Sequence, residues 1–124
     1  MSAEKFTKKY IDSSIPIIRE AVYREYVIHY LMDSMPGAHV EYFYDKNDAI
    51  EIAVKTEDDK IILCACQFTA PHMSYGKLDR ILKSCADHKI EYESIILFSA
   101  VDFDQKLRLY SSLHTEVKLI NLNR

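Results

Sequence analysis

Three cysteines and one histidine form the first pattern in this chain that could do chemistry. Cys64-x-Cys66, followed by Cys85-x-x-His88, offers four zinc-type ligands in two close pairs. However, Cys64 and Cys66 lie in an apolar run typical of a buried strand, where residues two apart share one face and are poorly placed to bond to each other. Such a strand also lacks the loop that usually wraps zinc. We therefore expect three reduced cysteines in the core and no metal site.

A second candidate group directly follows this apolar run. His72 and Ser74 could lie near the carboxyl end of a strand, but the spacing fixes no acid or nucleophile within hydrogen-bond reach of them. We interpret them as a loop histidine and a helix cap. The remaining histidines show no ligand spacing; they are His29, His39, His88 and His114.

Basic residues recur on one side of the amphipathic segment 74–87, namely Lys77, Arg80 and Lys83. This side could rest on nucleic-acid phosphates or could simply be solvated. The formal net charge of -3 argues against binding of nucleic acid or membranes by bulk charge. Any DNA binding through this face is expected to be weak and strongly reduced by salt.

Length and composition limit the class of protein. A chain of 124 residues corresponds to one domain, 1–124, and 48% hydrophobic residues are enough to form a core. The chain has no apolar run long enough to span a membrane and no signal-peptide pattern at its start. The sequence therefore predicts a cytoplasmic or nuclear protein without membrane partners.

Hydrophobic periodicity predicts the element order α-β-β-β-α-β-α-β, with a further short helix before residue 15. The first helix is expected at 15–34, with Ser14 as its N-cap, and the second at 74–87. A third, short helix is expected after a capping Asp102 or Asp104. Strands are expected at 39–44, 49–55, 60–68, 94–100 and 116–122, with a turn at 45–48 between the first two. Ile50, Ile52 and Val54 are expected on one face of their strand, and the unbroken apolar run 60–68 predicts the central strand of the sheet, covered on both faces. This order predicts an α/β fold with a mixed sheet and helices on both faces.

The long first helix is apolar on two sides. We assign the side of Ile18, Val22 and Met32 to the sheet. The other side needs a cover, either the N-terminal segment or a partner; it carries Arg19, Tyr23, Tyr26, Val27 and Tyr30. Because aromatic residues and arginine are enriched at interface centres, we expect a homodimer or a docked protein here.

Several segments resemble the PD-(D/E)-x-K nuclease superfamily, the restriction-endonuclease-like fold, in its Mrr-type branch. The similarity extends over about residues 18–122 and is carried by segments 23–31, 49–53, 60–68, 96–104 and 117–121. It implies an αβββαβ core with a mixed sheet flanked by helices, extended in this chain by another helix and a final strand.

The resemblance also implies a metal site, but two of its three charged residues are missing from this chain. The family uses an acid on the second strand, an acid on the third strand and a lysine two residues later. Glu51 matches the first acid if the turn between the second and third strands carries one extra residue, but Ala65 matches the second acid and Gln67 matches the lysine. Alanine cannot coordinate Mg²⁺ and the glutamine amide is neutral, so a catalytically degenerate copy is implied.

Three functional hypotheses follow. The first is a degenerate nuclease-fold module without cofactor, which acts as a binding or assembly subunit for nucleic acid or protein. The second is an active Mg²⁺-dependent DNA endonuclease that uses Glu51, Gln67 and an acid from elsewhere, with Glu25 as the candidate. The third is a small self-associating α/β protein unrelated to nucleases. Whether Glu51, Ala65 and Gln67 meet in an open cleft distinguishes them.

Overall fold

The computed structural model describes residues 16–43, 50–69 and 71–123. Its elements are α2 (Pro16–Ser34), β1 (His39–Phe43), β2 (Ile52–Lys55), β3 (Ile61–Gln67), α3 (Tyr75–His88), β4 (Ser94–Ser99), α4 (Gln105–Leu113) and β5 (Val117–Asn121). The order of the main elements is the predicted one. The predicted short N-terminal helix, the cap at Ser14 and the turn at 45–48 lie outside the described residues.

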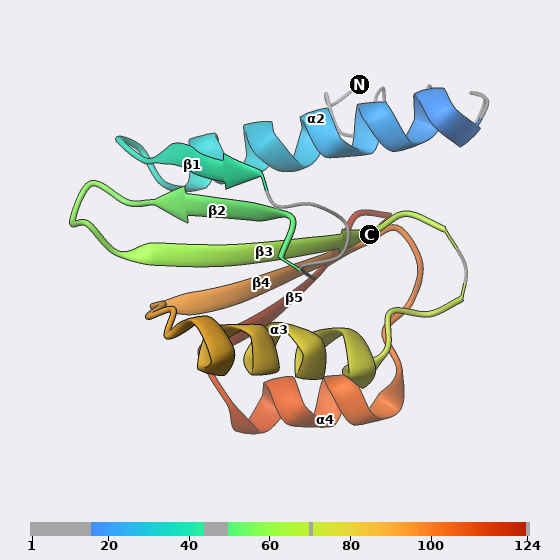
Figure 1. Ribbon diagram of the computed structural model, residues 1–124. Coiled ribbons are helices and arrows are strands. Elements are labelled where there is room, and N and C mark those ends of the chain that lie inside the picture. Colours follow the sequence, from blue (N-terminus) through green and yellow to red (C-terminus); the bar gives the residue numbers. More distant parts are fainter. Residues whose placement is uncertain (1–15, 44–49, 70, 124) are drawn as a thin grey trace.

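The five strands form one mixed sheet in the order β1-β2-β3-β4-β5. β2 runs antiparallel to β1 and β3, whereas β4 runs parallel to β3 and β5. Helix α2 covers one face of the sheet, and α3 and α4 cover the other (Figure 1). The predicted α/β architecture with helices on both faces is therefore confirmed.

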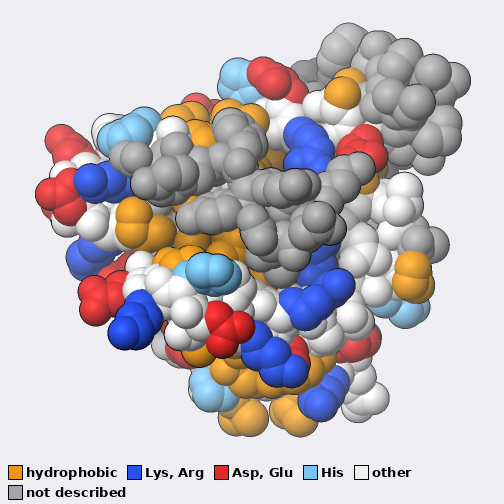
Figure 2. Space-filling model, in the orientation of Figure 1, with side chains coloured by type: hydrophobic (Ala, Val, Ile, Leu, Met, Phe, Trp, Pro, Cys, Tyr) orange, Lys and Arg blue, Asp and Glu red, His pale blue; other side chains and the backbone are white. Residues whose placement is uncertain are grey.

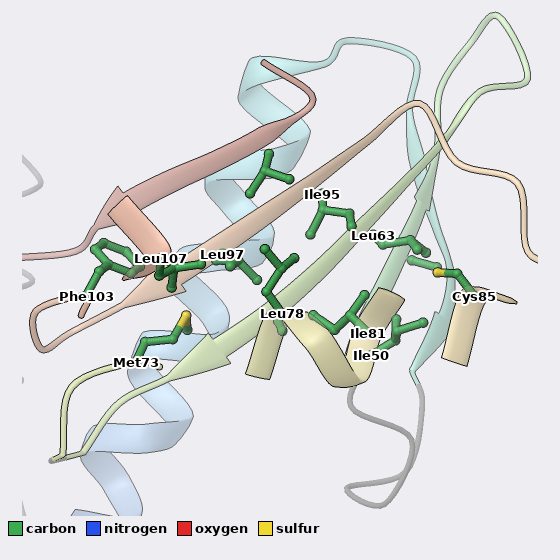
Figure 3. Packing of buried hydrophobic residues seen from close by; sticks show 13 residues of the cluster. Ile50, Leu63, Met73, Leu78, Ile81, Cys85, Ile95, Leu97, Phe103 and Leu107 are labelled. Atoms are coloured by element: carbon green, nitrogen blue, oxygen red, sulfur yellow. The ribbon is translucent and has the colours of Figure 1, made fainter. Parts of the chain in front are cut away.

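Each face of the sheet carries its own apolar cluster. Strand β3 contributes to both, because successive side chains of a strand point to opposite faces. Ile62, Cys64 and Cys66 face α2, whereas Leu63 and Ala65 face α3 and α4. Figure 3 shows the second cluster, where leucines and isoleucines of the two helices and the strands interdigitate. The burial of β3 on both faces confirms its predicted central place.

Helix α2 packs through a different side than the sequence predicted. Tyr23, Val27 and Leu31 are buried, at 4%, 0% and 0% exposure, whereas Val22 and Met32 are only half-buried. The assignment of Val22 to the sheet was therefore wrong, whereas Met32, from the same predicted side, does pack against the cluster under α2. Tyr23 can face the sheet because its ring stacks on Phe68 at 5.3 Å and its hydroxyl donates to Asn123 Oδ1 at 3.1 Å. Both partners come from distant parts of the chain, so periodicity could not reveal them.

The strand predicted over 49–55 begins only at Ile52. Ile52 and Val54 share the face under α2, as expected, but Ile50 belongs to the cluster on the opposite face. The prediction that all three share one face was wrong, because strict alternation holds only within a regular strand. Glu51 lies at this break, and its backbone N–H still donates to the Cys64 carbonyl at 3.1 Å.

All three cysteines are reduced and buried, as predicted. Cys64 and Cys66 lie in the cluster under α2, and Cys85 lies in the cluster on the other side of the sheet. Burial raises the pKa of Cys64 to about 12 and also raises the pKa of the Cys66 thiol. The two close pairs proposed as zinc ligands therefore lie on opposite faces of the sheet, and Cys64 and Cys66 are protonated at neutral pH.

Asp104 joins the starts of α3 and α4. One carboxylate oxygen accepts from the Leu107 backbone N–H at 2.7 Å and caps α4, and the other accepts from the Tyr75 N–H at 3.0 Å. Of the two caps that the sequence offered, Asp104 is the one used. Because both donors are orphan groups at helix starts, a single side chain satisfies two helices.

Asp104→Ala is expected to lower the free energy of unfolding by about 1–3 kcal/mol, because two partly buried backbone donors lose their acceptor. Asp104→Asn keeps one acceptor oxygen and should lose less. Urea unfolding of the three proteins measures the difference. Equal stability of wild type and Asp104→Ala would contradict the joining role.

Candidate functional site

Glu51 directly precedes β2 and is anchored to β3 by its side chain. Its Oε2 accepts a hydrogen bond from the Cys66 backbone N–H at 2.7 Å. Ile52, the first residue of β2, pairs with Cys64, so Cys66 has no partner residue in β2. The Glu51 carboxylate thus replaces the backbone acceptor that a longer β2 would supply.

Lys77 of α3 contacts both Glu51 and Cys66. Its Nζ donates to the Cys66 carbonyl and lies 3.9 Å from Glu51 Oε1. The side chains of Lys77 and Glu51 are only 16% and 18% exposed. An ion pair between α3 and the start of β2 therefore satisfies both backbone groups of Cys66.

Two further charges come from the second and third turns of α2. Arg24 Nη2 lies 3.2 Å from Glu20 Oε1 and 4.0 Å from Glu51 Oε1, so the guanidinium bridges two carboxylates. The same guanidinium lies over the Phe68 ring, 5.5 Å from its centroid. Phe68 in turn stacks on Tyr23, which fixes this wall of the site against α2.

These groups line an open hollow of about 350 Å³ between α2, the carboxyl end of β3 and the start of α3. Glu51 and Gln67 both lie on its wall. The Gln67 amide donates to the carbonyls of Thr69 (3.2 Å) and Pro71, so this side chain satisfies the backbone of the loop that follows β3. The hollow therefore brings together two of the three residues that the resemblance assigned to a metal site.

Ala65, the third of these residues, does not reach the hollow. It is fully buried in the cluster under α3 and α4, together with Met73 and Leu78. The position that matches the family's second acid is thus enclosed by apolar side chains. Only part of the predicted constellation meets in an open site.

The hollow is electrically balanced and poor in metal ligands. Its carboxylates, Glu20 and Glu51, face the cations of Arg24 and Lys77. Mg²⁺ prefers several oxygen ligands in octahedral geometry, and two cations about 4 Å from Glu51 repel a divalent ion. Within the described part of the chain, no three acidic, histidine or cysteine side chains gather in a way that could hold a metal.

Glu25, which the sequence suggested as the additional acid, lies outside the hollow. Its side chain is 71% exposed and its Oε1 lies 3.3 Å from His29 Nε2. Glu20, a little more than one turn earlier, occupies the position by the hollow instead. The choice between them depends on the rotation of α2 against the sheet, which was also the point where the sequence prediction of the buried side was wrong.

The predicted basic face of α3 is divided in the structure. Lys77 points to Glu51 and is largely buried, so its assignment to an exposed face was wrong. Lys83 pairs with Asp79 at 3.0 Å, and this hydrogen bond raises the pKa of Lys83. The third of the proposed phosphate-binding residues, Arg80, is exposed.

The predicted tyrosine interface on α2 is changed as well. Tyr23 is buried against the sheet, whereas Tyr30 is 37% exposed and meets Phe98 edge-on at 5.6 Å between ring centroids. Tyr26 is half-buried, and Arg19 lies in the first turn of the helix. The assignment of Tyr23 and Val27 to an outer stripe was wrong, while the predicted homodimer stays a prediction.

Comparisons with protein-family models, with curated proteins and with solved structures found no match to this chain. The described residues form an α/β protein with three helices and a mixed sheet of five strands. None of these helices combines the length and the apolar character needed to cross a bilayer.

The sequence did not indicate that three charged residues, Glu20, Arg24 and Lys77, form ion pairs around the hollow. Glu20 and Arg24 are four residues apart, a spacing that predicts an ion pair on one helix but no contact with the sheet. Lys77 lies on the polar side of the amphipathic segment 74–87, where residues are usually solvated. No signal in the sequence separates it from Arg80 or Lys83.

Proposed function

We propose that this chain is a nuclease-fold module without catalytic activity, which acts as a binding or assembly subunit. The observation that carries the proposal is the state of Glu51. One of its oxygens accepts from the Cys66 N–H, and the other faces Lys77 and Arg24 at about 4 Å. The side chain that would hold the metal is thus part of an ion-pair network that supports the sheet.

Two further observations support this reading. The helix and strand order, with α2 on one face and α3 and α4 on the other, agrees with the αβββαβ core that the resemblance implies. An alanine, Ala65, stands where the resemblance places the second acid, and it is buried in an apolar cluster. The scaffold is therefore retained while the acid pair needed for metal-assisted hydrolysis is lost.

Protein is the favoured class of partner. Of the cations proposed to contact phosphates, Lys77 and Lys83 are paired with Glu51 and Asp79. The chain also carries a formal net charge of -3, which repels a polyanion. Nucleic-acid binding would depend on the few positive charges that are not paired with an acid. Binding of a protein does not require unpaired positive charges.

A cleavage assay tests the loss of catalysis. Purified protein should leave supercoiled, linear and single-stranded DNA intact in the presence of Mg²⁺ or Mn²⁺, and calorimetry should detect no Mg²⁺ binding. Glu51→Gln serves as the matched control, since it removes the carboxylate that the resemblance assigns to the metal and keeps the hydrogen-bond acceptor for Cys66. Wild type and variant should be indistinguishable.

A second candidate function, a metal-dependent nuclease with an unusual site, is favoured by one observation. The hollow holds a second carboxylate, Glu20, and a lysine, Lys77, which could supply the charge that Gln67 lacks. In that case wild type would cleave DNA with Mg²⁺ or Mn²⁺, and both Glu51→Gln and Lys77→Met would lose the activity while staying folded. That result would replace the first proposal.

A further inference from the structure

The outer side of α4 carries the most exposed large hydrophobic side chains among the described residues. Leu109 is 61% exposed and Leu113 is 72% exposed. They lie four residues apart, so they form one ridge along the helix. The buried Leu107 fixes the inner side of α4, and Leu109 and Leu113 project away from it.

Cations flank this ridge on both sides. Lys106 and Arg108 are the neighbours of the buried Leu107, and successive helix residues are about 100° apart, so the two side chains leave α4 at opposite flanks. The segment 105–115 contains no acidic residue. Figure 2 shows orange side chains at the lower edge of the molecule, where Figure 1 places α4, with blue side chains next to them.

One flank is held in place by ring contacts. Lys106 Nζ lies over the Tyr75 ring, 4.5 Å from its centroid, and Tyr75 meets Tyr110 at 5.5 Å. Tyr110 stacks on His114 at 3.9 Å, and His114 Nδ1 lies 3.5 Å from Glu116. A prearranged surface of this kind loses less side-chain entropy when a partner binds.

From this surface we propose that the outer side of α4 binds an acidic amphipathic helix of another protein. The leucine ridge supplies the apolar contact, and Lys106 and Arg108 select glutamates or aspartates on both sides of the partner's apolar stripe. A second copy of this chain is a poor occupant, because pairing α4 with α4 would bring four of these cations together without an acid from the helices between them. The proposal deepens the proposed function, since it names the partner of an assembly subunit.

A designed probe tests the proposal. A synthetic helical peptide carries leucines at i, i+3, i+4 and i+7 with glutamates on both flanks, and a matched peptide has lysines in place of the glutamates. Fluorescence anisotropy measures binding of each to the full chain. We expect the acidic peptide to bind at least about tenfold more tightly than the basic peptide, which shares its apolar stripe.

Substitutions then assign the binding to α4. Leu109→Ser combined with Leu113→Ser should weaken the acidic peptide at least about tenfold, and both residues are exposed, so the fold is retained. Arg108→Glu should weaken the acidic peptide and improve the basic one. Arg80→Glu, the same charge change on α3, is the matched control and should leave both affinities unchanged.

Several results would overturn the proposal. They are equal binding of the two peptides, no binding of either, and binding that the leucine substitutions do not change. Binding of duplex DNA or of phosphatidylserine vesicles that requires Leu109 and Leu113 would assign the surface to another class of ligand. Concentration-dependent dimers abolished by the same substitutions would assign it to a second copy. None of these readouts depends on the hollow, so the loss of catalysis is tested separately.

Discussion

Ala65→Glu is expected to lower the free energy of unfolding by more than about 4 kcal/mol, enough to leave most of the protein unfolded or insoluble. Ala65 is 0% exposed and belongs to the cluster with Met73 and Leu78. A glutamate there would bury a carboxylate without a charged partner and force a larger side chain into a filled core. Thermal unfolding followed by circular dichroism measures the loss.

Two control variants separate the effect of burying a charge at position 65 from a general sensitivity of β3 to substitution. Ala65→Ser adds one small polar atom and should cost about 1 kcal/mol. Gln67→Lys, at the edge of the hollow, should change stability by no more than about 1 kcal/mol, since an ammonium can also donate to loop carbonyls. A soluble Ala65→Glu protein with unchanged stability and new Mg²⁺ binding would show that this position opens to the hollow, contrary to the structure.

Glu51→Ala is expected to lower the free energy of unfolding by about 2–3 kcal/mol. The change leaves the Cys66 N–H without its acceptor and Lys77 without its counter-charge in a largely buried position. Glu51→Gln should cost only about 1 kcal/mol, because its amide oxygen can still accept from Cys66. Chemical denaturation of the variants gives these values.

A double-mutant cycle tests the link between Glu51 and Lys77. Lys77→Met alone removes the donor to the Cys66 carbonyl and should cost about 1–2 kcal/mol. The double variant Glu51→Gln with Lys77→Met should cost less than the sum of the single variants by about 0.5–1 kcal/mol, because each single variant leaves a charge unpaired. Strict additivity would mean that the two side chains act independently.

The exposed pair Asp79 and Lys83 on α3 is the matched control for this cycle. Its side chains are 39% and 73% exposed, although its distance of 3.0 Å is shorter than that of the Glu51 pair. Solvent and salt screen an exposed pair, so the coupling in the cycle Asp79→Asn with Lys83→Met should stay below about 0.5 kcal/mol. The comparison therefore measures the effect of burial rather than distance.

Elements with a single strong pattern were predictable from the sequence. β3 was recognised as a central strand because an uninterrupted apolar run fits burial on both faces, and α3 was recognised from Leu78, Ile81 and Cys85 on one side. α2 was found with nearly correct bounds, but its buried side was not. Two apolar stripes on one helix are compatible with two rotations, and only contacts with distant residues choose between them.

The candidate site was predictable only in part. Glu51 and Gln67 were identified by their similarity to a known pattern, and both line the hollow. The burial of Ala65 agrees with the apolar run around it, but periodicity could not show that Met73 and Leu78 cover this residue, because that depends on how α3 packs on β3. Similarly, the choice of Glu20 over Glu25 depends on the rotation of α2.

The sequence by itself determined the order of the main elements, the mixed α/β class, the reduced state of the cysteines and the presence of the uncharged residues Ala65 and Gln67 toward the carboxyl end of β3. These properties depend on local periodicity and on residue identity. Only the tertiary structure decided that Lys77 pairs with Glu51 rather than with solvent, that Arg24 bridges Glu20 and Glu51, and that Leu109 and Leu113 remain exposed. Each of these depends on how helices and strands far apart in the chain pack together, because ion pairs and burial arise from distances in space rather than from spacing in sequence.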